Sequence, residues 1–158
     1  MTDGVSLRAV IDDDLPIFFE QQQDPVARHM AGFTSKDASD RDAFDAHWAK
    51  IRIDDTVTAM TIVLDGRVAG NIGSFALGGK PHVTYWIGRE HWGKGLATKA
   101  LSMFLGIITA RPLHASAAGD NIASIRVLER CGFAITGSEK AFANARGEEI
   151  EEVMLTLE

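Results

Sequence analysis

The sequence predicts an α/β fold in which one mixed, mostly antiparallel central sheet is flanked by about four helices, in a single domain over residues 1–158. A length of 158 residues fits one domain, since domains commonly hold about 100–200 residues. Hydrophobic residues make up 46% and charged residues 24%, a mixture typical of a chain that folds around its own core. Along the chain, β-branched runs bounded by turn signals alternate with stretches of helical periodicity, which predicts strands and helices in one layered domain.

The N-terminal segment is expected to form a strand followed by a helix. Residues 5–11 alternate loosely between apolar and polar side chains, as in a half-buried strand. Aspartates at positions 12–14 and Pro16 follow, and both residue types suit the first turn of a helix. We expect this helix to end near Gln23, because Asp24-Pro25 breaks it.

A second helix is expected after a polar, loop-like stretch over residues 31–40. Ser39 or Asp40 suits the position that caps a helix N-terminus. Phe44 and Trp48 then recur at helical spacing, which indicates a helix with one apolar face.

Three strands should follow as an antiparallel meander. Residues 56–64 are β-branched and apolar, and Asp65-Gly66 is a strong signal for a two-residue hairpin turn. Residues 68–77 therefore pair back on the preceding strand. Gly78-Gly79 predicts another turn, and residues 82–87 a further strand.

The C-terminal half begins with the clearest helix signal of the chain. Apolar residues recur every three or four positions over 96–108, which predicts a helix that ends before Arg111-Pro112. A short strand over 113–117 and a helix over 121–130 follow, and Gly132 suits a left-handed helix cap. The last expected elements are strands over 133–137 and 150–157, joined by a polar loop around 144–147.

Composition narrows the classes of function. The net charge is −6, with 16 Lys and Arg scattered among 22 acids, and no basic stripe of the kind that binds nucleic acid is present. The acidic balance mildly favours a cationic substrate, although net charge mostly serves solubility. The only cysteine, Cys131, can form no intramolecular disulfide, and no Cys/His cluster predicts a metal. With neither a signal peptide nor a run of about 20 apolar residues, we expect a cytoplasmic protein without a membrane partner.

The glycine-rich segment over residues 88–98 joins an expected strand to the long helix. A helix N-terminus offers free N–H groups and a positive dipole end, and Gly93 and Gly95 let the backbone approach a phosphate closely. The P-loop pattern fails because Gly95 replaces its Ser or Thr. The dinucleotide pattern fails because Thr98 stands in its third glycine position. A glycine turn without a ligand is the structural alternative.

This segment resembles the central signature of the GNAT superfamily of N-acetyltransferases, [RQ]-x-x-G-x-[GA]. Gly93 and Gly95 fill the glycine positions, whereas Glu90 stands where Arg or Gln is usual. The runs 85–88 and 92–98 are especially similar to the branch that acetylates the N-termini of ribosomal proteins.

A second GNAT signature, N-x-x-[AS]-x-x-L-Y-x-[KR]-x-G-F, follows in the expected order. The matching positions are Asn121, Ser124, Val127, Leu128, Arg130, Gly132 and Phe133. The expected order of strands and helices is similar to that of the family along nearly the whole chain.

The resemblance implies acetyl-CoA as co-substrate, no metal, and an amine acceptor, either a small molecule or a protein N-terminus. Trp86 and Ile87 would run along the pantetheine arm, and Asn121 would hydrogen-bond the co-substrate. Arg89 and Arg130 are candidates for the 3′-phosphate, with solvated surface arginines as the alternative. A homodimer is a candidate assembly because related enzymes often dimerise. The backbone N–H groups that would cradle the pyrophosphate belong to Gly93, Lys94, Gly95, Leu96, Ala97 and Thr98.

The reaction needs a base for the amine and a proton donor for the departing thiolate. The family's usual donor, a tyrosine, is replaced here by Leu128. The resemblance to the ribosomal-protein branch implies Ser124, one helical turn earlier, as a donor, and Tyr85 could reach the cleft from its strand. The alternatives are a capping or packing hydroxyl for Ser124 and a core or rim tyrosine for Tyr85. His82 is the candidate base, with an exposed strand histidine as its alternative.

Two other functions remain open at this point. A non-catalytic acyl-CoA-binding module would keep the glycine segment and lack the acid, as Leu128 suggests. A P-loop-like nucleotide binder is disfavoured by Gly95. The sequence does not identify the acceptor amine.

Overall fold

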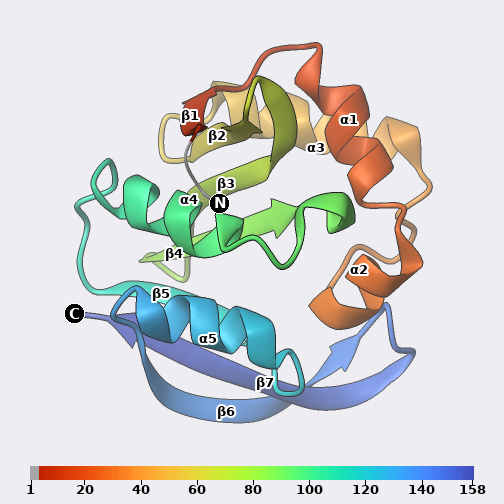
Figure 1. Ribbon diagram of the computed structural model, residues 1–158. Coiled ribbons are helices and arrows are strands. Elements are labelled where there is room, and N and C mark those ends of the chain that lie inside the picture. Colours follow the sequence, from red (N-terminus) through yellow and green to blue (C-terminus); the bar gives the residue numbers. More distant parts are fainter. Residues whose placement is uncertain (1–3) are drawn as a thin grey trace.

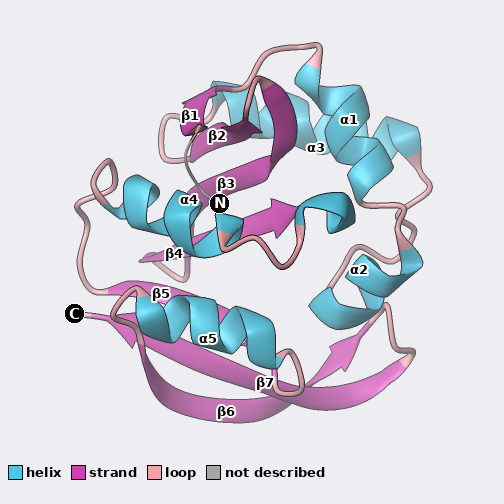
Figure 2. Ribbon diagram, viewed as in Figure 1, coloured by secondary structure: helices cyan, strands magenta, loops and turns pink. Residues whose placement is uncertain are grey.

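The computed structural model describes residues 4–158, which form one seven-stranded sheet with helices on both faces (Figure 1). Figure 2 separates the strands, in magenta, from the helices, in cyan. The strands are β1 (Val5–Ala9), β2 (Thr58–Leu64), β3 (Arg67–Leu77), β4 (Lys80–Ile87), β5 (Leu113–Ala118), β6 (Ala134–Ala143) and β7 (Glu148–Leu157). The helices are α1 (Asp14–Gln21), α2 (Pro25–Ala31), α3 (Arg41–Ile53), a 3-10 turn (Arg89–His91), α4 (Leu96–Leu105) and α5 (Ile122–Arg130).

The sheet has the order β1-β2-β3-β4-β5-β7-β6 and consists of two antiparallel parts. In one part β1 to β4 form a meander, and in the other β7 pairs with both β5 and β6. The parts meet where β4 runs parallel to β5, and there only His82 and His114 are paired within the described chain. The predicted mixed, mostly antiparallel sheet is therefore confirmed, and its one parallel junction is also its weakest.

Two hydrophobic clusters cover opposite faces of the sheet. The larger cluster packs α4 and α5 against the strands, and Figure 1 shows these two helices in front of the sheet. The smaller cluster, under α1 and α3, is centred on Phe18, Phe44 and Trp48, with the Phe18 and Trp48 rings 5.2 Å apart. Both helical patterns thus arise from apolar faces that pack on the sheet. Fully buried members of the larger cluster include Ile62, Leu101, Phe104, Leu113 and Leu155.

One helix was not predicted. Asp24-Pro25, which was expected only to end the first helix, also begins α2. The Asp24 carboxylate accepts hydrogen bonds from the backbone N–H groups of Val26 and Ala27 at 2.9 and 3.0 Å, and Pro25 occupies the first turn. An aspartate cap followed by proline is a strong start signal, so the same two residues stop one helix and start the next.

Other boundaries moved by a few residues. The first strand ends at Ala9, and α4 ends at Leu105. The last two strands are longer than predicted, because β6 extends through the polar residues 138–140. β6 lies at the sheet edge and is largely exposed, so its pairing depends on backbone hydrogen bonds that polar side chains do not disturb.

The turn between β6 and β7 is tied to α2 and to the loop before α5. The Arg146 guanidinium donates twice to the Asp120 carboxylate, both at 2.8 Å, and its Nε donates to the His29 carbonyl at 2.6 Å. The Ala145 N–H donates to the Gly32 carbonyl at 3.1 Å. These contacts hold α2 against the β5–β7 part of the sheet, although α2 follows α1 on the other part.

Candidate functional site

The glycine-rich segment forms an open turn between β4 and α4. Gly93 and Gly95 adopt φ of +77° and +72°, and Gly95 caps α4 without a side chain. Positive φ strains residues that carry a Cβ, so both positions favour glycine. Residues 92–95 are exposed. The predicted strand, glycine turn and helix start are thus all present.

The first turn of α4 leaves backbone N–H groups free. The first N–H groups of a helix have no acceptor inside it, and Gly95 offers no capping side chain. Within residues 4–158, no loop or cap hydrogen bond uses the N–H groups of residues 93–98 as donors. Trp92 supports the turn, because its indole Nε1 donates to the Ile87 carbonyl at 2.9 Å. The turn therefore presents converging donors that suit a pyrophosphate.

Next to this turn, β4 has an edge that no strand covers. Beyond the His82–His114 pair, β4 and β5 are no longer paired in the described chain. The Gly88 N–H donates to the Ala69 carbonyl of β3 at 2.8 Å. Since backbone groups alternate along a strand, those of Trp86 also face β3, whereas those of Tyr85 and Ile87 face the free edge. An extended ligand with amide groups could pair there as a short strand.

Tyr85 and Ser124, two of the three predicted catalytic residues, are in contact. The Tyr85 hydroxyl lies 2.8 Å from Ser124 Oγ and so joins β4 to the first turn of α5. Burial raises the pKa of Tyr85 to about 12, although the hydrogen bond with Ser124 opposes this rise. The phenol therefore stays protonated near neutral pH and can act as a proton donor.

The other residues of the second signature have structural partners. Asn121 caps α5 by accepting from the Ser124 N–H at 3.3 Å, and its Nδ2 donates to the Met30 carbonyl at 3.2 Å. The side chain of Leu128 is 1% exposed within the larger cluster and provides no polar group. Leu128 thus offers no proton donor, whereas Ser124 and Tyr85 nearby do.

His82, the predicted base, lies at the position where β4 and β5 are paired in the described chain, before the two strands separate. Its ring stacks on Phe75 and lies 5.3 Å from the ring of His114. Burial, the charge of His114 and that of Lys80 together lower the pKa of His82. The sequence alone gave no role to His114, because its proximity to His82 depends on the parallel pairing of β4 and β5. His82 and Tyr85 lie on opposite faces of the sheet, as their spacing predicts.

The basic side chains near the turn are exposed. Arg89 lies 3.5 Å from the Asp24 carboxylate at the start of α2. Lys94 and Arg130 are exposed, and Arg130 lies next to Cys131, whose Sγ is 3.6 Å from the Thr98 carbonyl of α4. The end of α5 thus lies close to the start of α4. Burial raises the pKa of Cys131, which disfavours a nucleophilic thiolate.

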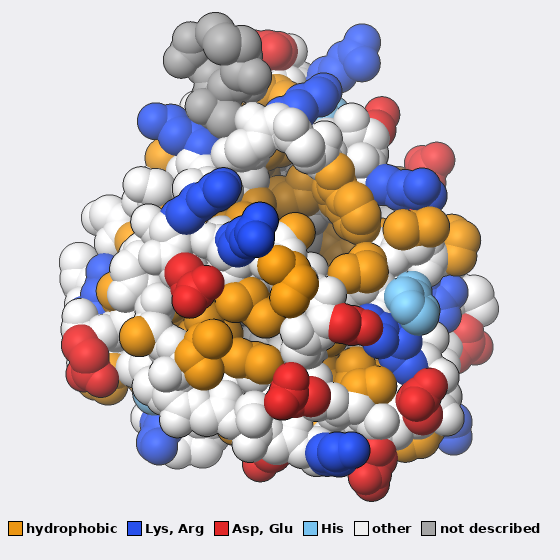
Figure 3. Space-filling view, turned by 60° about the horizontal axis from the view of Figure 1, so that its bottom comes forward, with side chains coloured by type: hydrophobic (Ala, Val, Ile, Leu, Met, Phe, Trp, Pro, Cys, Tyr) orange, Lys and Arg blue, Asp and Glu red, His pale blue; other side chains and the backbone are white. Residues whose placement is uncertain are grey.

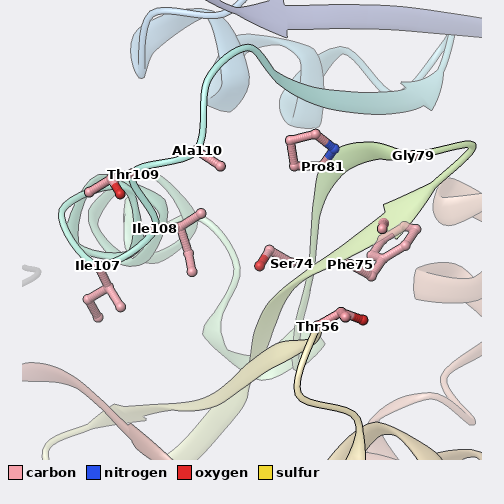
Figure 4. A pocket seen from close by; sticks show the side chains of 10 residues that line it. Thr56, Ser74, Phe75, Gly79, Pro81, Ile107, Ile108, Thr109 and Ala110 are labelled. Carbon is pink, nitrogen blue, oxygen red and sulfur yellow. The ribbon is translucent and has the colours of Figure 1, made fainter.

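Two hollows open on the molecular surface, one beside the β3–β4 hairpin and one beside α1. The larger one, of about 480 Å³, opens between the loop after α4 and the β3–β4 hairpin, with Ile108 and Ser74 on opposite walls (Figure 4). Its lining contains no titratable side chain and so offers no acid or base. The smaller one, of about 270 Å³, lies between α1 and residues 88–90 and is lined by Glu20 and Asp24.

The molecular surface carries no block of one charge on the face shown in Figure 3, where basic and acidic side chains are intermixed around a hollow with hydrophobic walls. Within residues 4–158, no cluster of three or more His, Cys, Asp or Glu could bind a metal ion. None of the helices described is sufficiently long and apolar to span a membrane.

A comparison with family models places residues 5–134 in the family described as "Acetyltransferase (GNAT) domain". No curated protein sequence matches the chain.

Solved structures with the same fold cover nearly the whole chain. Spermidine N-acetyltransferase from Vibrio cholerae, in complex with CoA and spermine, is 18% identical with a TM-score of 0.77, covering 97% of this chain and 95% of that one. RimJ from Mycobacterium smegmatis, in complex with CoA-disulfide, is 22% identical with a TM-score of 0.77, covering 97% and 81%. The Microcin C7 self immunity acetyltransferase MccE, in complex with acetyl-CoA and AMP, is 15% identical with a TM-score of 0.80, covering 98% and 92%. At these identities the likeness establishes the fold alone.

Proposed function

The chain belongs to the GNAT acetyltransferase family, and we propose that it transfers the acetyl group of acetyl-CoA directly to a primary amine in a ternary complex, as one domain over residues 1–158. One observation carries this proposal. The free edge of β4 runs from the exposed N–H groups at the start of α4 to the hydrogen-bonded pair Tyr85 and Ser124. A phosphate-binding turn, an extended groove edge and a proton donor thus follow one another along one strand.

The residues of the turn fit the charged part of acetyl-CoA. The N–H groups of residues 93–98 are free to bind the pyrophosphate, and Lys94 is exposed beside them. Arg89 and Arg130 remain candidates for binding the 3′-phosphate. To do so, Arg89 would have to give up its 3.5 Å contact with the Asp24 carboxylate. The backbone N–H and carbonyl of Tyr85 and the N–H of Ile87 suit the amides of the pantetheine arm, whereas the Ile87 carbonyl already accepts from Trp92. When bound, acetyl-CoA supplies a thioester carbonyl that an amine can attack.

The groups that accept and donate protons in this proposal, His82 and the pair Tyr85 and Ser124, lie on opposite faces of the sheet. His82 accepts the proton that the amine loses, because its lowered pKa keeps the imidazole neutral near pH 7. Ser124 Oγ donates a proton to the leaving sulfur, Tyr85 replaces that proton through their 2.8 Å hydrogen bond, and the Tyr85 phenolate then takes a proton from solvent. Leu128 leaves the position of the family's usual tyrosine without a donor, so this pair takes over its role.

The acceptor is a primary amine, either a small molecule or a protein N-terminus. Related folds include a spermidine N-acetyltransferase, which illustrates a small-molecule amine as acceptor. Resemblance of residues 85–88 and 92–98 to the ribosomal-protein branch supports a protein N-terminus. The net charge of −6 and the carboxylates of Glu20 and Glu90 in the smaller hollow favour a cationic acceptor of either kind.

A non-catalytic acyl-CoA-binding module is the second candidate, favoured by the apolar, buried Leu128 in place of the usual acid. It predicts binding of acetyl-CoA without release of free CoA in the presence of any amine. Detection of free thiol during incubation with acetyl-CoA and a panel of amines, including spermidine and peptides with free N-termini, separates the two candidates.

The binding half of the proposal is tested by calorimetric titration with acetyl-CoA, ATP and NAD. Gly95→Trp places a large side chain at the start of α4, and Gly78→Trp adds the same side chain at φ +60° in the β3–β4 turn, where no atom lies within 4 Å of a Cβ. We expect acetyl-CoA alone to bind, with affinity lost in Gly95→Trp and retained in Gly78→Trp. Equal affinity in the two variants would show that the turn does not hold the co-substrate.

A further inference from the structure

A row of ring and hydroxyl side chains crosses the sheet at the junction of its two parts. Phe75, His82, His114 and Thr156 occupy directly paired positions on β3, β4, β5 and β7. Side chains at paired positions stand side by side on one face of a sheet. The row thus continues from the predicted base across the parallel junction and into the C-terminal part of the sheet.

The members of this row are in contact. The His82 ring stacks on Phe75, with the centroids 5.6 Å apart, and lies 5.3 Å from the His114 ring. His114 Nδ1 is 3.2 Å from Thr156 Oγ1. Thr156 Oγ1 is in turn 3.2 Å from the hydroxyl of Thr136, which is exposed on β6. The hydroxyls of Thr156 and Thr136 therefore join His114 to solvent, and His114 packs directly against His82.

The surroundings of His82 oppose its protonation. Besides His114, the charged group that acts on His82 is Lys80, on the same strand. Both are positive when protonated, so protonation of one imidazole opposes protonation of its neighbour. Because Thr156 engages Nδ1 of His114, Nε2 is the nitrogen of this ring that remains free for exchange.

Resting on the acetyl transfer proposed above, we infer that His82 and His114 form a single proton-accepting unit in which His114 positions His82 and passes its proton through Thr156 and Thr136 to solvent. The amine N–H bond breaks, and the proton binds a ring nitrogen of His82. A proton then moves to His114, directly or across one water, and Nδ1 of His114 releases one toward Thr156. Both rings end neutral, and each regains its starting tautomer by proton exchange with solvent before the next turnover.

The coupling is tested by following the imidazole signals of ¹⁵N-labelled protein through a pH titration, without any substrate. His114→Gln keeps a side chain able to reach Thr156 but removes the charge, and we expect it to raise the titration midpoint of His82 by about 0.5–1 pH unit. The acidic limb of the kcat/KM profile should move by the same amount. His47→Gln, on the exposed face of α3, is the control and should move neither.

A second variant tests the exit route. Thr156→Val keeps the size of the side chain but removes the hydroxyl, and we expect kcat to fall about 5-fold or more with little change in KM. A His82 midpoint that stays within 0.1 unit in His114→Gln, or a Thr156→Val enzyme with unchanged kcat, would overturn the inference while leaving acetyl transfer intact. Coupled titration in a protein that acetylates no amine would instead overturn the proposed reaction, and the role of the pair with it.

Discussion

Tyr85 and Ser124 were each predicted as candidate proton donors, but their contact could not be predicted. The two residues come from a strand and a helix that are far apart in the sequence, and only the packing of α5 on the sheet brings their oxygens to 2.8 Å. His114 illustrates the same limit, since no local pattern marks a histidine that matters through its neighbour on a parallel strand. Motifs identified the glycine turn and the start of α5, whereas the chemistry depends on contacts between elements.

The first prediction concerns this donor pair. Tyr85→Phe removes only the hydroxyl, and we expect kcat to fall about 10-fold to 100-fold while the Kd for acetyl-CoA changes less than about 2-fold. Ser124→Ala should reduce kcat by at least as much, and the double variant should be little worse than Ser124→Ala, because the two hydroxyls act in series. Steady-state kinetics and calorimetry provide these values. Ser102→Ala, exposed on α4, is the control, and full kcat in the double variant would exclude the pair as donor.

Asp14 supports the second prediction, which concerns acid stability. Its carboxylate is 1% exposed and accepts from Arg8 at 2.7 and 2.9 Å and from the Thr61 hydroxyl at 2.7 Å. Burial alone would raise the pKa of Asp14, but the hydrogen bonds from Arg8, Ile11 and Thr61 outweigh it, and the pKa is lowered. A lowered pKa stabilises the fold above the unfolded value of about 3.9 and loses that contribution as pH falls through the folded value.

Asp14→Asn should therefore reduce the free energy of unfolding by about 1–3 kcal/mol at pH 7, because a charged hydrogen-bond acceptor is replaced by a neutral one. The loss should shrink as pH falls below the unfolded value of about 3.9, where the unfolded wild type takes up a proton at Asp14, and should vanish below the folded value. Urea denaturation between pH 3 and pH 7 measures both effects. Asp12→Asn, whose side chain is 90% exposed beside Arg52, should have no measurable effect. A loss that is constant with pH would mean that the ionised form of Asp14 is not what matters.

Among whole elements, those with repeated signals were the most predictable. Helices α4 and α5 carry wide apolar faces and glycines at or just beyond their ends, and the hairpin between β2 and β3 turns at Asp65-Gly66 as predicted. Helix α2 was missed because its seven residues are too few for an apolar period to emerge. The length of β6 was missed because an exposed edge strand needs no alternating pattern. The prediction of helices and strands thus failed where an element is too short or too exposed to show a periodic pattern of apolar residues.

Taken as a whole, the molecule consists of two antiparallel parts joined at one paired position between β4 and β5. Other links between the parts include the hydrogen bonds from Arg146 to the His29 carbonyl and from the Ala145 N–H to the Gly32 carbonyl, and the 2.8 Å contact between Tyr85 and Ser124. A ligand that fills the free edge of β4 would replace missing strand pairing and fasten the parts together. Binding should therefore stabilise the molecule globally and protect that edge locally.

The third prediction combines these two effects. At about 100 times its Kd, acetyl-CoA should stabilise the fold by about 2.7 kcal/mol, which corresponds to a rise in Tm of roughly 5–10 °C for a domain of this size. Site-resolved amide exchange should slow about 10-fold or more at Tyr85 and Ile87, whose N–H groups face the free edge. Trp86 provides an internal control, because its N–H already faces β3, so any slowing there reports the global stabilisation alone, whereas Tyr85 and Ile87 should gain protection that they lack without the ligand. Equal protection of all three amides would indicate general tightening of the fold, whereas the alternating pattern requires a ligand paired along β4.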